Sequence, residues 1–96
     1  MGIDLQGRRA VVTGAASGFG KAITVALIQR GATVVATDVN DEGLAQLAGE
    51  IGSDALHTQR LDVGDATAWA SLVADFGPFD LALLNAGVAT HHIRPE

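Results

Sequence analysis

The sequence contains no cysteine and no tyrosine among its 96 residues. Without cysteine, the chain forms neither a disulfide nor a thiolate metal site, which is typical of a cytoplasmic protein. Without tyrosine, no phenol group from these residues acts as an acid or base. We therefore expect a cytoplasmic protein, and any chemistry must come from other side chains or from a cofactor.

Basic residues are also scarce. The chain has six Lys and Arg residues and eleven Asp and Glu residues, which gives a formal net charge of -5. Binding to nucleic acid needs clustered basic side chains, so we do not expect nucleic acid as a partner. Long apolar runs are missing too, because stretches such as 22–28 are too short to cross a bilayer. The N-terminus carries Asp4 where a secretory signal carries bases, so no membrane partner is expected.

Four short runs rich in β-branched and apolar residues alternate with three segments of helical periodicity. We expect strands over 9–13, 32–37, 55–61 and 79–84. The apolar faces of the expected helices are Phe19, Ala22, Ile23, Ala26 and Leu27; then Leu44, Leu47, Ala48 and Ile51; then Trp69, Leu72, Val73 and Phe76. Asn40 or Asp41 is the expected cap of the second helix, and Asp65 that of the third.

This alternation predicts an α/β fold, a Rossmann-like doubly wound parallel sheet with strand order 3-2-1-4, truncated after the fourth strand. Residues 1–96 then form one half domain with ligands bound beyond the carboxyl ends of the strands. The apolar fourth strand lies at an open edge, a hazard that proteins usually cover. We expect further chain or another subunit beside it.

A glycine-rich run, 13–20, follows the first strand and opens the first helix. Unpaired N–H groups and the positive end of the helix dipole bind phosphates at such a position. Gly14 suits the tight turn, Gly18 the close approach of phosphates, and Gly20 the packing of helix on strand. Ser17 and Phe19 complete the expected site, and a turn that serves packing alone is the alternative.

Asp38 ends the second strand, eighteen residues after Gly20. A carboxylate there accepts hydrogen bonds from both hydroxyl groups of an adenosine ribose and repels a 2′-phosphate. The sequence therefore predicts a preference for NAD over NADP. The alternative is that Asp38 only caps the following helix.

Together with these features, Asp62-Val63 and Leu84-Asn85-Ala86-Gly87 make nearly the whole chain resemble the cofactor-binding half of the short-chain dehydrogenase/reductase family. The resemblance implies that Asp62 holds the adenine amino group and that Val63 contacts adenine through its backbone. It also implies that Asn85, Ala86 and Gly87 line the ribose and nicotinamide side. For Asp62, a capping role on the next helix is the alternative.

The sequence departs from the family pattern in two ways. Leu84 stands where the family usually has another Asn, which removes an amide that ties the central strands together. The family's catalytic Ser and Tyr-x-x-x-Lys group are absent, and the single lysine, Lys21, is expected to be a solvated surface residue. We therefore assign no catalytic residue, and no metal site, because His91 and His92 are expected to be loop or tail residues.

The resemblance implies the NAD(H)-binding portion of an oxidoreductase that oxidises an alcohol or reduces a carbonyl by hydride transfer. A complete enzyme of this kind binds a small-molecule substrate, and we expect a homo-oligomer or a missing C-terminal half. Two alternatives remain open at this point. One is a non-catalytic NAD-binding module that pairs with another subunit, and the other is a methyltransferase-like domain that binds S-adenosylmethionine.

Overall fold

The computed structural model describes residues 4–85. In chain order, the elements are β1 (Arg9–Thr13), α1 (Gly18–Gln29), β2 (Thr33–Asp38), α2 (Asp41–Ile51), β3 (Leu56–Arg60), α3 (Ala66–Phe76) and β4 (Leu81–Leu84). All seven expected elements are present. The bounds of the strands differ from the expected ones by two residues at most, the usual uncertainty at element ends.

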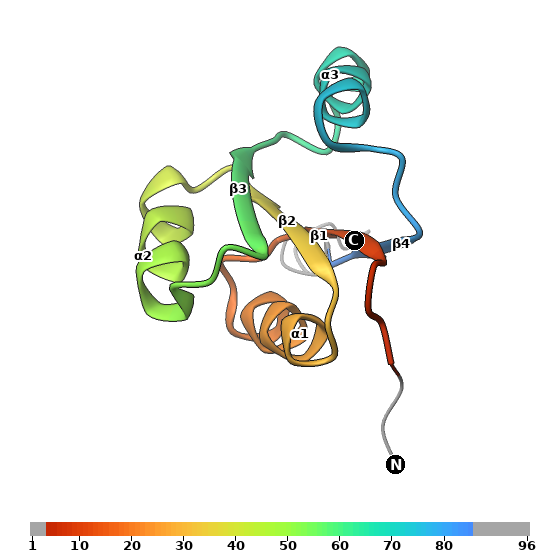
Figure 1. The fold of residues 1–96 in the computed structure, drawn as a ribbon. Helices are drawn as coiled ribbons and strands as arrows, with labels where there is room; N and C mark the ends of the chain where they lie inside the picture. Colours follow the sequence, from red (N-terminus) through yellow and green to blue (C-terminus); the bar gives the residue numbers. More distant parts are fainter. Residues whose placement is uncertain (1–3, 86–96) are drawn as a thin grey trace, which may run out of the picture.

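The four strands form one parallel sheet in the order β3-β2-β1-β4, which confirms the predicted topology (Figure 1). The chain runs outward from β1 to β3 and then returns to the other side of β1. β1 and β2 are central, and their apolar residues are almost fully buried. The carboxyl ends of all four strands therefore meet at one edge, on both sides of the point where the strand order reverses.

Helices cover both faces of the sheet (Figure 1). α1 and α2 lie on one face, where Leu44 and Leu47 of α2 join Val12 and Val34 in the larger core. α3 lies on the other face, where Leu72 packs with Val11, Val35 and Leu61. Alternate residues of a strand point to opposite faces, so the central strands β1 and β2 contribute to both cores.

The helix starts follow the sequence closely. The side chain of Asn40 accepts a hydrogen bond from Gly43 N and caps α2, which decides between Asn40 and Asp41. Asp65 caps α3 by accepting from Ala68 N, as expected. Such caps satisfy N–H groups that have no partner within the helix.

Three residues assigned to apolar helix faces, Phe19, Ala22 and Val73, are exposed rather than in the core, so those assignments were wrong. Phe19 is 68% exposed, because α1 presents Gly20 and Thr24 to the sheet and its buried face is rotated by about one position. Val73 is 46% exposed, whereas Trp69 and Phe76 of the same helix pack beside Leu72. Helical spacing of apolar residues indicates that a helix has one buried side, but it does not determine which residues lie at the centre of that side.

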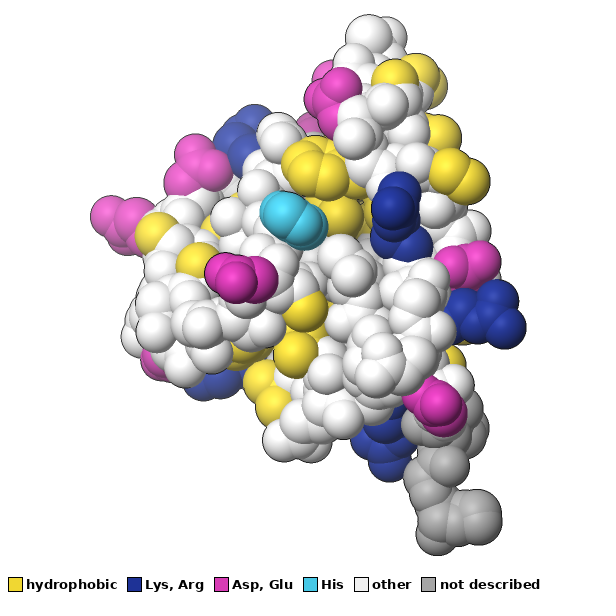
Figure 2. All heavy atoms as spheres, viewed as in Figure 1, with side chains coloured by type: hydrophobic (Ala, Val, Ile, Leu, Met, Phe, Trp, Pro, Cys, Tyr) yellow, Lys and Arg dark blue, Asp and Glu magenta, His cyan; other side chains and the backbone are white. Residues whose placement is uncertain are grey.

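β4 pairs only with β1, so it forms an edge of the sheet within residues 4–85. Its side chains alternate between half-buried and exposed, and Leu84 is 66% exposed. In the face shown in Figure 2, some apolar side chains lie in the region between α3 and the sheet, and acidic and basic side chains are scattered over the face and its rim. None of the helices in the described part of the chain has the length and apolar character needed to span a bilayer.

Candidate functional site

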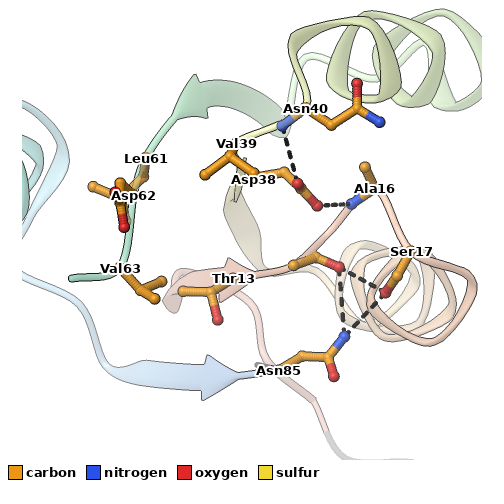
Figure 3. A pocket seen from close by; sticks show the side chains of 11 residues that line it. Thr13, Ala16, Ser17, Asp38, Val39, Asn40, Leu61, Asp62, Val63 and Asn85 are labelled. Atoms are coloured by element: carbon orange, nitrogen blue, oxygen red, sulfur yellow. Dashed lines mark hydrogen bonds between the residues drawn. The ribbon is translucent and has the colours of Figure 1, made fainter. Parts of the chain in front are cut away.

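A cavity of about 420 Å³ opens at the carboxyl ends of the strands (Figure 3). Every strand contributes to its lining through the residues at or just beyond its end. These residues are Thr13, Gly14, Ala16, Ser17, Asp38, Val39, Asn40, Leu61, Asp62, Val63 and Asn85. Six of the eleven residues predicted for the site are among them, namely Gly14, Ser17, Asp38, Asp62, Val63 and Asn85.

The glycine-rich run forms the turn between β1 and α1. Gly14 has a φ of 64°, a left-handed conformation that favours glycine, and a Cβ there would overlap the carbonyl oxygen of Asn85. A Cβ on Gly20 would overlap the backbone of Gly14 and Ala15. Both glycines are therefore required for packing within the protein itself.

Gly18 differs from these two glycines. A Cβ on Gly18 would have no atom within 4 Å among the described residues. Gly18 and Phe19 do not line the cavity. They are the first two residues of α1, and backbone N–H groups at this position have no hydrogen-bond acceptor within the helix. Ser17 caps this helix by accepting from Gly20 N at 3.2 Å. The start of α1 thus presents backbone donors with open space in front of Gly18.

Asp38 lies at the end of β2 and is held by two backbone groups (Figure 3). Its Oδ2 accepts from Ala16 N and its Oδ1 from Asn40 N, each at 3.0 Å. Since Asn40 is the cap of α2, the alternative in which Asp38 caps that helix is wrong. A carboxylate has about four acceptor positions, so two remain for a ligand in the cavity.

Asp62 and Val63 line the opposite side of the cavity, beyond β3. Asp62 Oδ1 accepts from Gly64 N at 3.0 Å in a local turn, while α3 is capped by Asp65. A capping role for Asp62 is therefore wrong as well. The Val63 carbonyl accepts from the indole N–H of Trp69, which fixes this segment against α3.

Asn85 connects the end of β4 to the glycine-rich turn. Its side-chain amide donates to Ser17 Oγ at 3.1 Å and to Gly14 O at 3.4 Å. The sequence placed Asn85 at the cavity but did not reveal these contacts. Ala86 and Gly87, also predicted for the site, lie outside the described residues, as do His91 and His92.

Thr13 adds a polar group that was not among the predicted lining residues. It is 1% exposed, it lines the cavity, and its hydroxyl has no hydrogen-bond partner within residues 4–85. Val39, Asn40 and Leu61 were not predicted as lining residues either. Their position directly at a strand end was the available signal.

Lys21 is a surface residue, as expected, and it also forms an ion pair. Its ammonium group pairs with Glu50 of α2, and both side chains are about half exposed. The hydrogen bond and the charge of Lys21 hold the pKa of Glu50 below its ordinary value of 4.5. Among the described residues, no group of three His, Cys, Asp or Glu side chains is placed to hold a metal ion.

Comparison with known proteins identifies the family. Residues 8–96 match the family model described as short chain dehydrogenase. The chain is 47% identical to 2-keto-3-deoxy-L-fuconate dehydrogenase of Xanthomonas campestris pv. campestris, over 86% of this chain and 27% of that protein. It is 40% identical to 2-dehydro-3-deoxy-L-rhamnonate dehydrogenase (NAD(+)) of Sphingomonas sp., over 85% of this chain and 34% of that protein.

A solved structure agrees with this result. The fold is similar to 3-ketoacyl-(acyl-carrier-protein) reductase of Brucella melitensis, crystallised with NADH, with a TM-score of 0.71 and 32% identity over 82% of this chain and 34% of that one. The chain thus spans about a third of the length of the proteins it matches. By its sequence and by its fold, the chain belongs to the short-chain dehydrogenase family, whose members bind a nicotinamide dinucleotide.

Proposed function

We propose that residues 1–96 form the NAD(H)-binding portion of a dehydrogenase that oxidises an alcohol or reduces a carbonyl group by hydride transfer. The observation that carries this proposal is the placement of Asp38, whose carboxylate is oriented by two backbone N–H groups at the edge of the cavity. NAD supplies the hydride acceptor when bound, and this chain supplies the binding groups.

The residues present fit a dinucleotide. The open space at Gly18, beside the first N–H groups of α1, suits a diphosphate, because the backbone donors and the helix dipole favour negative charge there. The buried hydroxyl of Thr13 needs a polar partner, since a buried polar group without a hydrogen bond is costly. On the far side, Asp62 and Val63 are the proposed contacts of adenine.

Asp38 also supports NAD rather than NADP. A carboxylate gains charge-assisted hydrogen bonds from the two ribose hydroxyls, and it repels a 2′-phosphate at the same position. The neighbouring Val39 and Ala16 carry no charge that would offset this repulsion. Family membership does not show whether the cofactor is NAD or NADP, so the proposed preference depends on the Asp38 side chain.

Calorimetric titration of the full-length protein with NADH, and separately with NADPH, tests the proposal. We expect NADH to bind at least about tenfold more tightly, equivalent to ~1.4 kcal/mol. The double variant Asp38→Ala, Val39→Arg should reverse the preference, because the repulsion is then replaced by attraction. An unchanged ratio in that variant would contradict the assignment of Asp38, and no binding by the unaltered protein would contradict the function itself.

A non-catalytic NAD-binding module remains the second candidate, because β4 is an edge strand within residues 4–85 and could pair with another chain. Turnover of a panel of carbonyl substrates with NADH by the full-length protein would exclude this candidate. Membership of the dehydrogenase family lends no support to the methyltransferase alternative. The proposed substrate class is a hydroxyl or carbonyl compound, in keeping with the names of both sugar-acid dehydrogenases among the relatives.

A further inference from the structure

α2 begins with a glycine in an unusual position. Gly43 is the third residue of this helix and is half-buried, although glycine is a poor helix former. A Cβ on Gly43 would lie 2.7 Å from the Cβ of Ala16 in the glycine-rich turn, and 2.9 Å from Nδ2 of Asn40, which is the end of a side chain and can move. Ala16 Cβ sits directly on the loop backbone, so it cannot rotate away as a longer side chain would. The missing side chain at Gly43 therefore allows α2 to lie against the turn.

Ala16 is also the residue whose backbone N–H holds Asp38. The other oxygen of Asp38 accepts from Asn40 N, and the side chain of Asn40 accepts in turn from Gly43 N. These four residues form a closed circuit of contacts: three hydrogen bonds join Asp38 to Ala16, Asp38 to Asn40, and Asn40 to Gly43, and the close approach of Gly43 to Ala16 completes it. Three of the four residues line the cavity, and Gly43 stands behind them.

We propose that Gly43 is a positioning residue that fixes the orientation of the Asp38 carboxylate, and thereby the preference of the site for a dinucleotide with a free 2′-hydroxyl. This inference rests on the proposed function. A side chain at Gly43 pushes Ala16 away, so its N–H no longer meets Asp38 Oδ2. The carboxylate then loses the geometry needed to bind both ribose hydroxyls, because hydrogen bonds weaken steeply with misalignment.

The test compares Gly43→Ala with Gly49→Ala in the full-length protein, using NADH and NADPH as ligands. Gly49 lies in the same helix, and a Cβ there would meet no atom within 4 Å among the described residues, so it is a matched control. For Gly43→Ala, we expect NADH affinity to fall about tenfold, the loss of one charge-assisted hydrogen bond. NADPH affinity should fall less, so the ratio of the two affinities should shrink. Gly49→Ala should leave the ratio unchanged.

A second substitution makes the mechanism specific. Ala16→Gly removes the methyl group that a Cβ at position 43 would strike. The double variant Gly43→Ala, Ala16→Gly should therefore move the ratio of NADH to NADPH affinity back toward the original, since contacting residues couple in this way; the contact with the Asn40 side chain remains. If Gly43→Ala only destabilised the helix, the melting temperature would fall but the ratio of NADH to NADPH affinity would not change.

The outcomes separate this inference from the proposed function. If the unaltered protein prefers NADH and Gly43→Ala keeps the same ratio, the role of Gly43 is contradicted while the function stands. Failure of Ala16→Gly to rescue Gly43→Ala contradicts the circuit of contacts. If the unaltered protein binds neither dinucleotide, the proposed function fails, and this inference fails with it.

Discussion

The side-chain amide of Asn85 donates a hydrogen bond to the Ser17 hydroxyl across 3.1 Å, and so joins residues 68 positions apart in the sequence. Ser17 is at the same time the cap of α1, where it accepts from Gly20 N. The end of β4 and the start of α1 are therefore held in one hydrogen-bonded unit. That unit forms one wall of the cavity.

Replacement of Asn85 by Ala should lower the free energy of unfolding by about 1 kcal/mol, because the amide makes one good and one longer hydrogen bond. Chemical denaturation of the full-length protein measures this change. Gln46→Ala is the control, since that exposed amide makes only a 3.4 Å contact with Glu50 and should change stability little. Equal effects of both substitutions would argue against a special role of the Asn85 contact.

Gly18 and Gly20 should respond to alanine in opposite ways. Gly20→Ala forces its Cβ into the backbone of Gly14 and should destabilise the protein by about 1–3 kcal/mol, the usual cost of overpacking. Gly18→Ala should leave the melting temperature unchanged or raised, because its Cβ enters open space at a helix start. It should nevertheless weaken NADH binding about tenfold, or ~1.4 kcal/mol, if phosphates approach there. Full affinity in Gly18→Ala would mean that the open space serves no phosphate.

Thr13 and Thr37 make a matched pair of buried threonines on neighbouring strands. The Thr37 hydroxyl donates to Val12 O at 3.0 Å, whereas the Thr13 hydroxyl has no partner among the described residues. Thr37→Val should therefore cost about 1 kcal/mol of stability, and Thr13→Val should cost nothing or stabilise the unliganded protein. Thr13→Val should also weaken NADH binding several-fold, measurable by calorimetry, if that hydroxyl bonds the ligand. A loss of stability equal to that of Thr37→Val would show that Thr13 has a structural partner.

The Lys21–Glu50 pair should make stability depend on pH in the acid range. Lys21 lowers the pKa of Glu50 below 4.5 in the folded protein, so the folded state binds fewer protons than the unfolded state there. The contribution is complete above pH 4.5 and is lost as the pH falls through the folded-state pKa. NMR titration of the Glu50 carboxyl group measures this pKa directly. Lys21→Gln should move it back toward 4.5, and a titration already at 4.5 in the unaltered protein would contradict the pairing.

Much of the fold follows from short-range patterns in the sequence. The four β-branched runs, the three helical repeats and the glycines that end them predict alternating strands and helices, and right-handed crossovers then leave few topologies. Asp38 and Asn85 could be placed at one edge because each ends a strand, and parallel strands end on the same side. The strand order and the position of these polar residues at one edge of the sheet could therefore be predicted from the sequence.

Other features were decided only by the tertiary structure. The spacing of Phe19 and Val73 fits an apolar stripe, but the neighbouring elements determine which part of each helix is covered, and both side chains are exposed. The Gly43–Ala16 contact and the Asn85–Ser17 hydrogen bond join segments distant in sequence. Periodicity records burial along one element, whereas contacts of this kind depend on how two elements approach each other. The sequence alone determined the elements and their order, and packing between elements determined how the candidate site is held together.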